Sequence, residues 1–272
     1  MNSVDILKLQ TEVDWRELRD RLGQASAVPK LLGDARSAVD QRERDNAWAE
    51  LWDRLCRDGQ RFSASAEVVP HLAAYALDAS APDRDRAVKL LLEIAVGYPE
   101  DYVGGPWTLA ELQEIVEESA GYEELMRWPA ACYMAAARVV PALLPLLGES
   151  SEKLRAVTAF VSPFFLDQRE TWSVALRARW QLEQHPEVRA GLAPALFFVS
   201  AIAEAELRSL MVDEKEDELL RVACAAALVR TRRRQKEEDP GEARAVLDTV
   251  TKELRMSGDF PWRKLIYAEA KL

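Results

Sequence analysis

The stretch that decides the fold of this chain is Asn46–Gly97, NAWAELWDRLCRDGQRFSASAEVVPHLAAYALDASAPDRDRAVKLLLEIAVG. It reads as three helices joined by short breaks. In Asn46–Cys56 and in Arg86–Val96 the apolar residues follow the spacing that marks one face of an α-helix. Between them Val68–Leu77 predicts the middle helix, with Pro70 in its first turn, where a missing N–H is tolerated. No single helix here can cover its own apolar face, so each needs a stacked neighbour, as in a helical repeat.

The rest of the chain shows the same helical periodicity, and sustained period-two alternation is absent. The predicted fold class is therefore all-α. A loop rich in Gly and Pro over Gly97–Pro106 interrupts the pattern and carries interleaved aromatic residues. The further helices that we expect are Val13–Leu22, Ala27–Asp34, Thr108–Ser119, Ala130–Val140, Glu152–Val161, Glu170–Gln184, Pro186–Ala203, Ala205–Met211, Lys215–Arg234, Glu242–Leu254 and Pro261–Leu272.

Two short motifs recur along the chain. An apolar-Pro-x-Leu opening occurs at Val28–Leu31, Val69–Leu72 and Val140–Leu143, and the first two prolines are 41 residues apart, a spacing typical of HEAT or armadillo units. The third lies 71 residues further on, which predicts an irregular insertion near residues 97–121. An acidic residue followed by apolar-Arg-Ala begins Glu152–Ala156 and Glu187–Ala190, with a looser copy at 218–223, and favours the start of a second repeat helix.

The first third of the chain resembles bacterial HEAT-repeat proteins of unassigned role. The residues that carry this resemblance are Asp14-Trp15 with Leu18, Ala27-Val28-Pro29, Trp48-Ala49-Glu50-Leu51-Trp52, Asp58-Gly59-Gln60, Ala64 to Ala66 and Val69-Pro70-His71-Leu72. The resemblance implies one α-solenoid over 1–272, with its best-matching repeats at 13–97, an irregular insertion at 98–128 and further helical pairs at 129–272. Where that family often has a His or an aromatic residue before the turn, this chain has Cys56-Arg57, so no polar site carries over there.

The net charge of -10 argues against a dedicated nucleic-acid binder, because phosphate binding needs a basic face. An acidic surface suits a basic protein partner, and it also keeps a protein soluble. The one strong basic cluster is Arg230–Lys236, at the end of a predicted helix, where cations interact favourably with the helix dipole. Binding of an acidic partner or of nucleic acid is the other interpretation, and Glu237–Asp239 neutralises much of the field.

The sequence carries no recognisable catalytic or metal-binding motif. His71 and His185 have no second His or Cys at ligand spacing, and the cysteines Cys56, Cys132 and Cys224 form no CxxC pair. No GxSxG elbow and no phosphate-binding glycine loop is present. We therefore expect no metal, no cofactor and no enzymatic activity. The N-terminus lacks a signal-peptide pattern and the apolar runs are short, so we expect a cytoplasmic protein without a membrane span.

The chain has eight tryptophans and six tyrosines, and two groups among them bear on function. One group lies in helical phase and is expected to pack in the core or between repeats: Trp48, Trp52, Trp172 and Trp180. The other lies in or beside the irregular insertion, where the contact residues of a solenoid often project, and these are the candidate partner-binding residues: Tyr98, Tyr102, Trp107 and Tyr122.

The favoured hypothesis is a non-enzymatic protein–protein interaction scaffold with a basic protein partner. A narrower form of it is an immunity or accessory protein of a bacterial toxin system, since toxin domains that attack nucleic acid are often basic. The alternative is an enzyme resembling the HEAT-like DNA glycosylases, which need a basic groove with aromatic residues and a carboxylate. Salt-sensitive DNA binding separates the two hypotheses.

Overall fold

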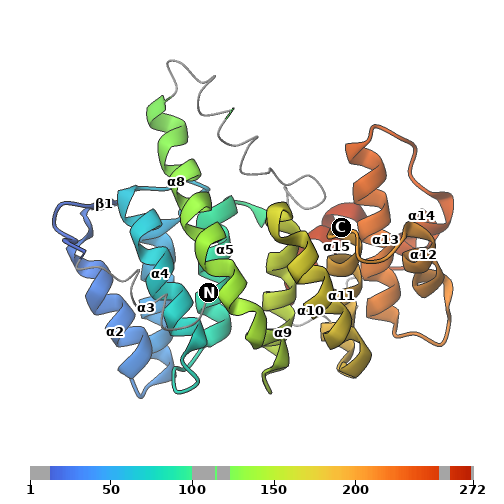
Figure 1. The fold of residues 1–272 in the computed structure, drawn as a ribbon, viewed down its shortest axis with the longest axis horizontal. Coiled ribbons are helices and arrows are strands. Elements are labelled where there is room, and N and C mark those ends of the chain that lie inside the picture. Colours follow the sequence, from blue (N-terminus) through green and yellow to red (C-terminus); the bar gives the residue numbers. More distant parts are fainter. Residues whose placement is uncertain (1–12, 100–113, 115–122, 251–257, 271–272) are drawn as a thin grey trace. The chain divides into compact units, whose positions relative to one another are not determined.

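The computed structural model describes residues 13–99, 114, 123–250 and 258–270 (Figure 1). Over these residues the protein is all-α, as predicted, and strand is confined to one pair of two-residue segments. The chain divides into two compact units. The described part of unit 1 comprises residues 13–99, 114 and 123–143, and that of unit 2 comprises 144–250 and 258–270.

Unit 1 is built from helices that pack in pairs. Helix α4 packs along α5, α2 packs along α3, and α8 contacts both α4 and α5. Its core contains the apolar residues predicted from the 46–97 pattern, with Trp48, Leu51 and Leu91 at 0–1% exposure. The described elements are β1 (Arg19–Asp20), β2 (Gly23–Gln24), the 3-10 helix η1 (Ala25–Ala27), α2 (Val28–Ser37), α3 (Gln41–Leu55), α4 (Ser63–Leu77), α5 (Arg84–Val96) and α8 (Glu123–Val139), followed by the 3-10 helix η2 (Val140–Gly148), which runs into unit 2.

Unit 2 repeats the pairing. Helix α9 packs against α11, and α11 against α13, while α10 covers α11 and α12 covers α13. Helices α14 and α15 both pack on α13. The described elements are α9 (Glu152–Val161), the 3-10 helices η3 (Ser162–Phe164) and η4 (Leu166–Gln168), α10 (Arg169–Leu182), α11 (Pro186–Phe198), α12 (Glu204–Val212), α13 (Glu218–Arg234), α14 (Gly241–Asp248) and α15 (Arg263–Ala270).

The predicted helix at Val13–Leu22 is wrong. Residues 19–20 pair antiparallel with residues 23–24 as a small hairpin, and Gly23 has a φ of 128°. Asp20 accepts a hydrogen bond from the Leu22 N–H at 2.8 Å, and the Arg21 N–H donates to the Arg54 carbonyl at 3.0 Å. A ten-residue helix is marginal in water, so these side-chain and tertiary hydrogen bonds decide the local structure.

Two helices begin earlier than their apolar patterns indicate. Helix α3 begins at Gln41 because the Asp40 carboxylate caps it, accepting from the Arg42 N–H at 2.7 Å. Helix α4 begins at Ser63, so Pro70 lies inside the helix and not in its first turn. The three apolar-Pro-x-Leu motifs consequently occupy different positions: the start of α2, the middle of α4 and the start of η2.

An arginine recurs as the fourth residue of four helices, Arg44 in α3, Arg155 in α9, Arg189 in α11 and Arg221 in α13. Three of them reach a carboxylate that lies just before a later helix: Asp83 before α5, Glu183 before α11 and Glu216 before α13. Within unit 1, Arg44 meets Asp83 at 3.0 Å.

In unit 2 the same contacts join Arg155 to Glu183 at 2.8 Å and Arg189 to Glu216 at 3.2 Å. Arg221 instead donates to the Met211 carbonyl at the end of α12, at 3.0 Å. The apolar-Arg-Ala motif of the sequence therefore marks helix starts, and its arginine ties one helix pair to the next or closes the turn behind it.

One segment within the described residues, 127–148, is long and apolar enough to cross a membrane by length and composition. It corresponds to most of α8 together with η2, and 56% of its most apolar window is buried inside the protein. A core helix of a soluble protein passes the same test, so the feature is consistent with a soluble protein.

Candidate partner-binding groove

Of the four aromatic residues predicted to bind a partner, only Tyr98 lies within the described residues. Its side chain is 43% exposed, and its ring packs over Gly59 in the turn between α3 and α4. Tyr102, Trp107 and Tyr122 lie outside the described residues. The interface assigned to these four residues stays a prediction.

The tryptophans predicted to be structural are packed as expected. Trp48 and Trp172 are 1% and 0% exposed. Trp52 donates its indole N–H to Glu93 at 2.5 Å, and Trp180 lies beneath the Arg189 guanidinium at 4.3 Å. None of these four rings is left as an exposed aromatic stripe.

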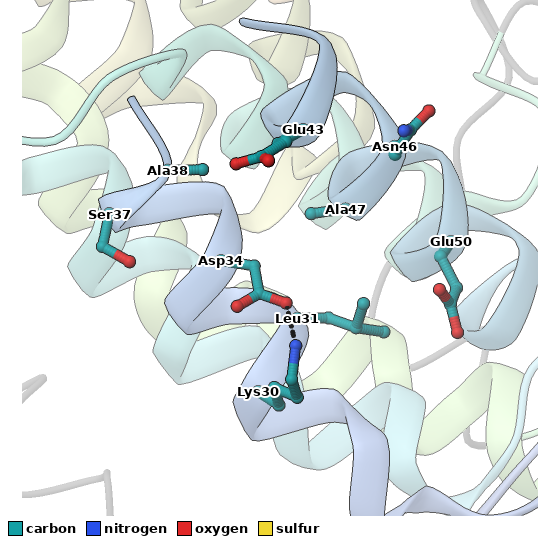
Figure 2. A pocket seen from close by; sticks show the side chains of 9 residues that line it. All are labelled: Lys30, Leu31, Asp34, Ser37, Ala38, Glu43, Asn46, Ala47 and Glu50. Atoms are coloured by element: carbon teal, nitrogen blue, oxygen red, sulfur yellow. Dashed lines mark hydrogen bonds and ion pairs between the residues drawn. The ribbon is translucent and has the colours of Figure 1, made fainter. Parts of the chain in front are cut away.

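A groove of about 520 Å³ opens between α2 and α3 in unit 1 (Figure 2). Its apolar floor includes Leu31 from α2 and Ala47 from α3, which are 8% and 4% exposed. Its polar lining comes from both helices: Lys30, Asp34 and Ser37 on α2, and Glu43, Asn46 and Glu50 on α3. The volume of this groove lies in the range of ligand sites in proteins, and its lining is more polar than is usual for such sites.

The rim of this α2–α3 groove is acidic. Three of its side chains are carboxylates, Asp34, Glu43 and Glu50, against the single ammonium of Lys30. Lys30 donates to Asp34 at 2.6 Å, and this hydrogen bond, together with the charges of Asp34 and Glu50, raises the pKa of Lys30. Within the described part of the chain, Glu43 has no hydrogen-bond or ion-pair partner, and Figure 2 shows it across the groove from Asp34.

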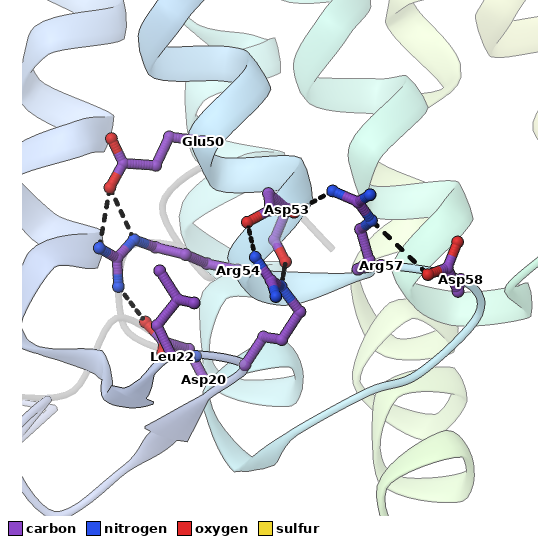
Figure 3. A network of polar contacts seen from close by, with 8 residues as sticks. Asp20, Leu22, Glu50, Asp53, Arg54, Arg57 and Asp58 are labelled. Atoms are coloured by element: carbon purple, nitrogen blue, oxygen red, sulfur yellow. Dashed lines mark hydrogen bonds and ion pairs between the residues drawn. The ribbon is translucent and has the colours of Figure 1, made fainter.

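The groove ends at a fixed polar network (Figure 3). Glu50 accepts from Arg54 at 2.8 Å, and Arg54 also pairs at 2.9 Å with Asp20, whose side chain is fully buried. Beside them Asp53 is held between Arg21 and Arg57. Hydrogen bonds from these two arginines lower the pKa of Asp53. This network anchors the β1–β2 hairpin to α3 and fixes the C-terminal half of that helix.

Three arginines of the basic run Arg230–Lys236 form ion pairs with carboxylates of unit 2. Arg230 and Arg233 bind the two carboxylate oxygens of Glu269 in α15, at 2.7 and 2.6 Å, and Glu269 is only 3% exposed. Arg232 makes a two-oxygen contact with Glu204 at the start of α12, at 2.7 and 2.8 Å. These three arginines clamp α12 and α15 to the end of α13 through ion pairs between side chains, a structural role that the helix-dipole interpretation did not include.

The other titratable residues considered as site candidates, one histidine and three cysteines, are partly or fully buried. Burial lowers the pKa of His71, whose ring lies 5.5 Å from that of Trp15. Burial likewise raises the pKa of the Cys56 thiol to about 12 and raises the pKa of the Cys132 and Cys224 thiols. These thiols therefore stay protonated at neutral pH and are poor nucleophiles. Among the described residues no three His, Cys, Asp or Glu side chains gather as a metal site needs.

The α2–α3 groove was not anticipated from the sequence. Its only local signal is the spacing of Glu43, Asn46 and Glu50, which places three polar residues on one face of α3. The α2 side of the groove depends on tertiary packing. Comparison with protein-family models, with curated proteins and with solved structures finds no match to this chain.

Proposed function

We propose that this protein is a non-enzymatic interaction scaffold that binds a basic segment of another protein. The observation that carries the proposal is which charged side chains are already bound to an opposite charge within the protein. Three arginines of the basic run are bound to carboxylates of their own unit, whereas the carboxylates of the α2–α3 groove outnumber its one cation. An acidic protein with an acidic groove complements a cationic partner.

The architecture that we propose is an α-solenoid of HEAT-like helix pairs. Its support is the recurring arginine at the fourth position of α3, α9, α11 and α13 and the packing of α9, α11 and α13 in succession. A stack of similar helix pairs needs a contact that repeats from one helix pair to the next, because each pair contacts only its neighbours. Such stacks offer long surfaces for protein partners.

The narrower form of the proposal is an immunity or accessory protein for a bacterial toxin that acts in the cytoplasm. It rests on the acidic charge and on the resemblance of residues 13–97 to bacterial HEAT-repeat proteins. The three cysteines are free and buried, which suits a reducing compartment.

The alternative, a DNA glycosylase-type enzyme, requires cations that face a groove. The ion pairs of Arg230, Arg232 and Arg233 weigh against it, because each guanidinium already binds a carboxylate and cannot release counterions from a phosphate backbone at full strength.

The test uses tagged full-length protein as bait in an extract of its native host, with duplex DNA binding measured in parallel at low and moderate salt. The proposal predicts a stoichiometric protein partner with a basic surface and no salt-sensitive DNA binding. Recovery of no stoichiometric partner, or DNA affinity that falls steeply with salt, would overturn it.

A further inference from the structure

We infer that the α2–α3 groove is where the partner docks, and that its occupant is an extended peptide segment with an arginine or lysine next to apolar residues. This inference rests on the proposed function and adds the site and the chemistry of the occupant.

The size of the groove fits a short extended segment. Its α2 wall runs from Lys30 to Ala38, a rise of about 12 Å at 1.5 Å per residue. An extended chain advances roughly 3.3 Å per residue, so about four residues match this length. The site therefore suits a linear motif.

The floor and the rim of the groove contact different parts of the same cationic side chain. Leu31 and Ala47 offer a narrow apolar floor on which the aliphatic stem of an arginine or lysine can lie. Glu43, in the first turn of α3, and Asp34 on α2 then face the cationic head from opposite sides (Figure 2). Charge-assisted hydrogen bonds to carboxylates are the strong ones, and a planar guanidinium can engage both oxygens of one carboxylate.

Lys30 is a built-in competitor for this site. Its side chain is 78% exposed and its pair with Asp34 is a surface contact between residues one helical turn apart. Pairs of this kind contribute little, so an incoming cation can displace the ammonium from Asp34. Removing Lys30 should therefore strengthen binding, an effect opposite in sign to that of removing Glu43.

The charges also distinguish the occupant from other ligands. Nucleic acid and acidic peptides would meet three carboxylates with one ammonium between them. An apolar amphipathic helix would need a wide apolar strip, whereas the floor here offers one leucine and one alanine among charged side chains.

The experiment titrates full-length protein into a fluorescent amidated peptide of alternating arginine and leucine, read by anisotropy at low and moderate salt. The variants are Glu43→Lys and Lys30→Ala. Their matched controls are Glu214→Lys and Lys215→Ala, at exposed positions before α13 with the same changes of charge. Circular dichroism checks that each variant keeps its helix content.

If the peptide binds in the groove, we expect its binding to be about tenfold weaker for Glu43→Lys, because a like charge then faces the peptide. We expect about threefold tighter binding for Lys30→Ala, and changes below about twofold for both controls. Equal effects of Glu43→Lys and Glu214→Lys would mean attraction to the whole acidic surface and would overturn the inference, as would equal effects of the two lysine variants.

The natural partner separates this inference from the proposed function. If a stoichiometric basic partner is recovered and binds Glu43→Lys as tightly as wild type, the α2–α3 groove is not the docking site and the scaffold function stands. If no partner is recovered while the peptide shows the predicted pattern, the proposed function fails and the groove remains a cation-recognition site. Loss of the natural partner from Glu43→Lys, with Glu214→Lys retained, supports both.

Discussion

The buried carboxylate of Glu183 in unit 2 and the exposed carboxylate of Glu43 in the α2–α3 groove of unit 1 have opposite surroundings. Glu183 is 1% exposed, binds Arg155 and Arg179, and accepts the backbone N–H groups of Gln184 and His185. Glu43 is exposed and, among the described residues, meets no cation.

Glu269 repeats the unit 2 arrangement, with Arg230 on one oxygen and Arg233 on the other. A charged residue in the sequence does not always leave a free charge on the surface, because an ion pair within the fold can neutralise it. Three arginines of the longest basic run in the chain are bound to carboxylates within their own unit, whereas Glu43 meets no cation among the described residues.

The largest effect is expected for Glu183→Ala. The variant leaves the Arg155 guanidinium buried without its carboxylate, which typically costs about 3–5 kcal/mol of unfolding free energy. Urea unfolding at neutral pH measures it. Glu170→Ala, at an exposed carboxylate of α10, the helix that ends just before Glu183, is the control and should change stability by less than about 1 kcal/mol. Similar losses in both variants would contradict the buried ion-pair cluster.

The pH dependence of stability should report the same cluster. Burial alone would raise the pKa of Glu183, but its hydrogen bonds from Arg155, His185 and Arg179 lower the pKa from 4.5 to about 2. The stabilisation from this lowered pKa is full above about pH 4.5 and is lost as the pH falls towards 2.

Urea midpoints of wild type and Glu183→Gln should therefore converge as the pH falls through this range. A gap that stays constant from neutral pH to pH 2 would show that the Glu183 carboxylate is not held ionised in the folded state.

Glu269→Gln is expected to cost about 1–3 kcal/mol, because the amide offers only one acceptor to the two arginines that bind the native carboxylate. Thermal unfolding followed by circular dichroism measures the change. Glu238→Gln, at an exposed position after α13, is the control with the same charge change. No difference between the two variants would mean that α15 is not clamped by the basic run.

The smallest effect is expected for Glu43→Gln. Exposed carboxylates contribute little to folding, so the unfolding free energy should change by less than about 0.5 kcal/mol. Urea unfolding beside Glu183→Gln makes the comparison direct. A loss as large as that of the buried residue would show that Glu43 supports the fold and is not held ready for a partner.

Much of the fold could be predicted from apolar spacing alone. The all-α class, the helices around Leu51 and Leu91 and the burial of Trp48 and Trp172 follow from one apolar face per helix. Helix starts were predicted less well, because Asp40 begins α3 by capping, a signal that precedes the apolar pattern.

The hairpin at residues 19–24 and the groove could not be predicted for a different reason. The hairpin depends on contacts of Asp20 and Arg21 with Arg54, more than thirty residues away in the chain. The groove depends on α2 lying beside α3, which brings Asp34 to face Glu43. No local pattern encodes either juxtaposition, whereas Arg155 and Arg189 could be recognised because their motif recurs.

Whether the protein presents carboxylates of α2–α3 to a cationic partner can be measured by mapping backbone amide chemical-shift changes in full-length protein on adding the arginine–leucine peptide. We expect the largest changes to cluster in α2 and the first three turns of α3, around Asp34 and Glu43. Changes centred on α13 and the basic run, or changes spread evenly over the acidic surface, would contradict it.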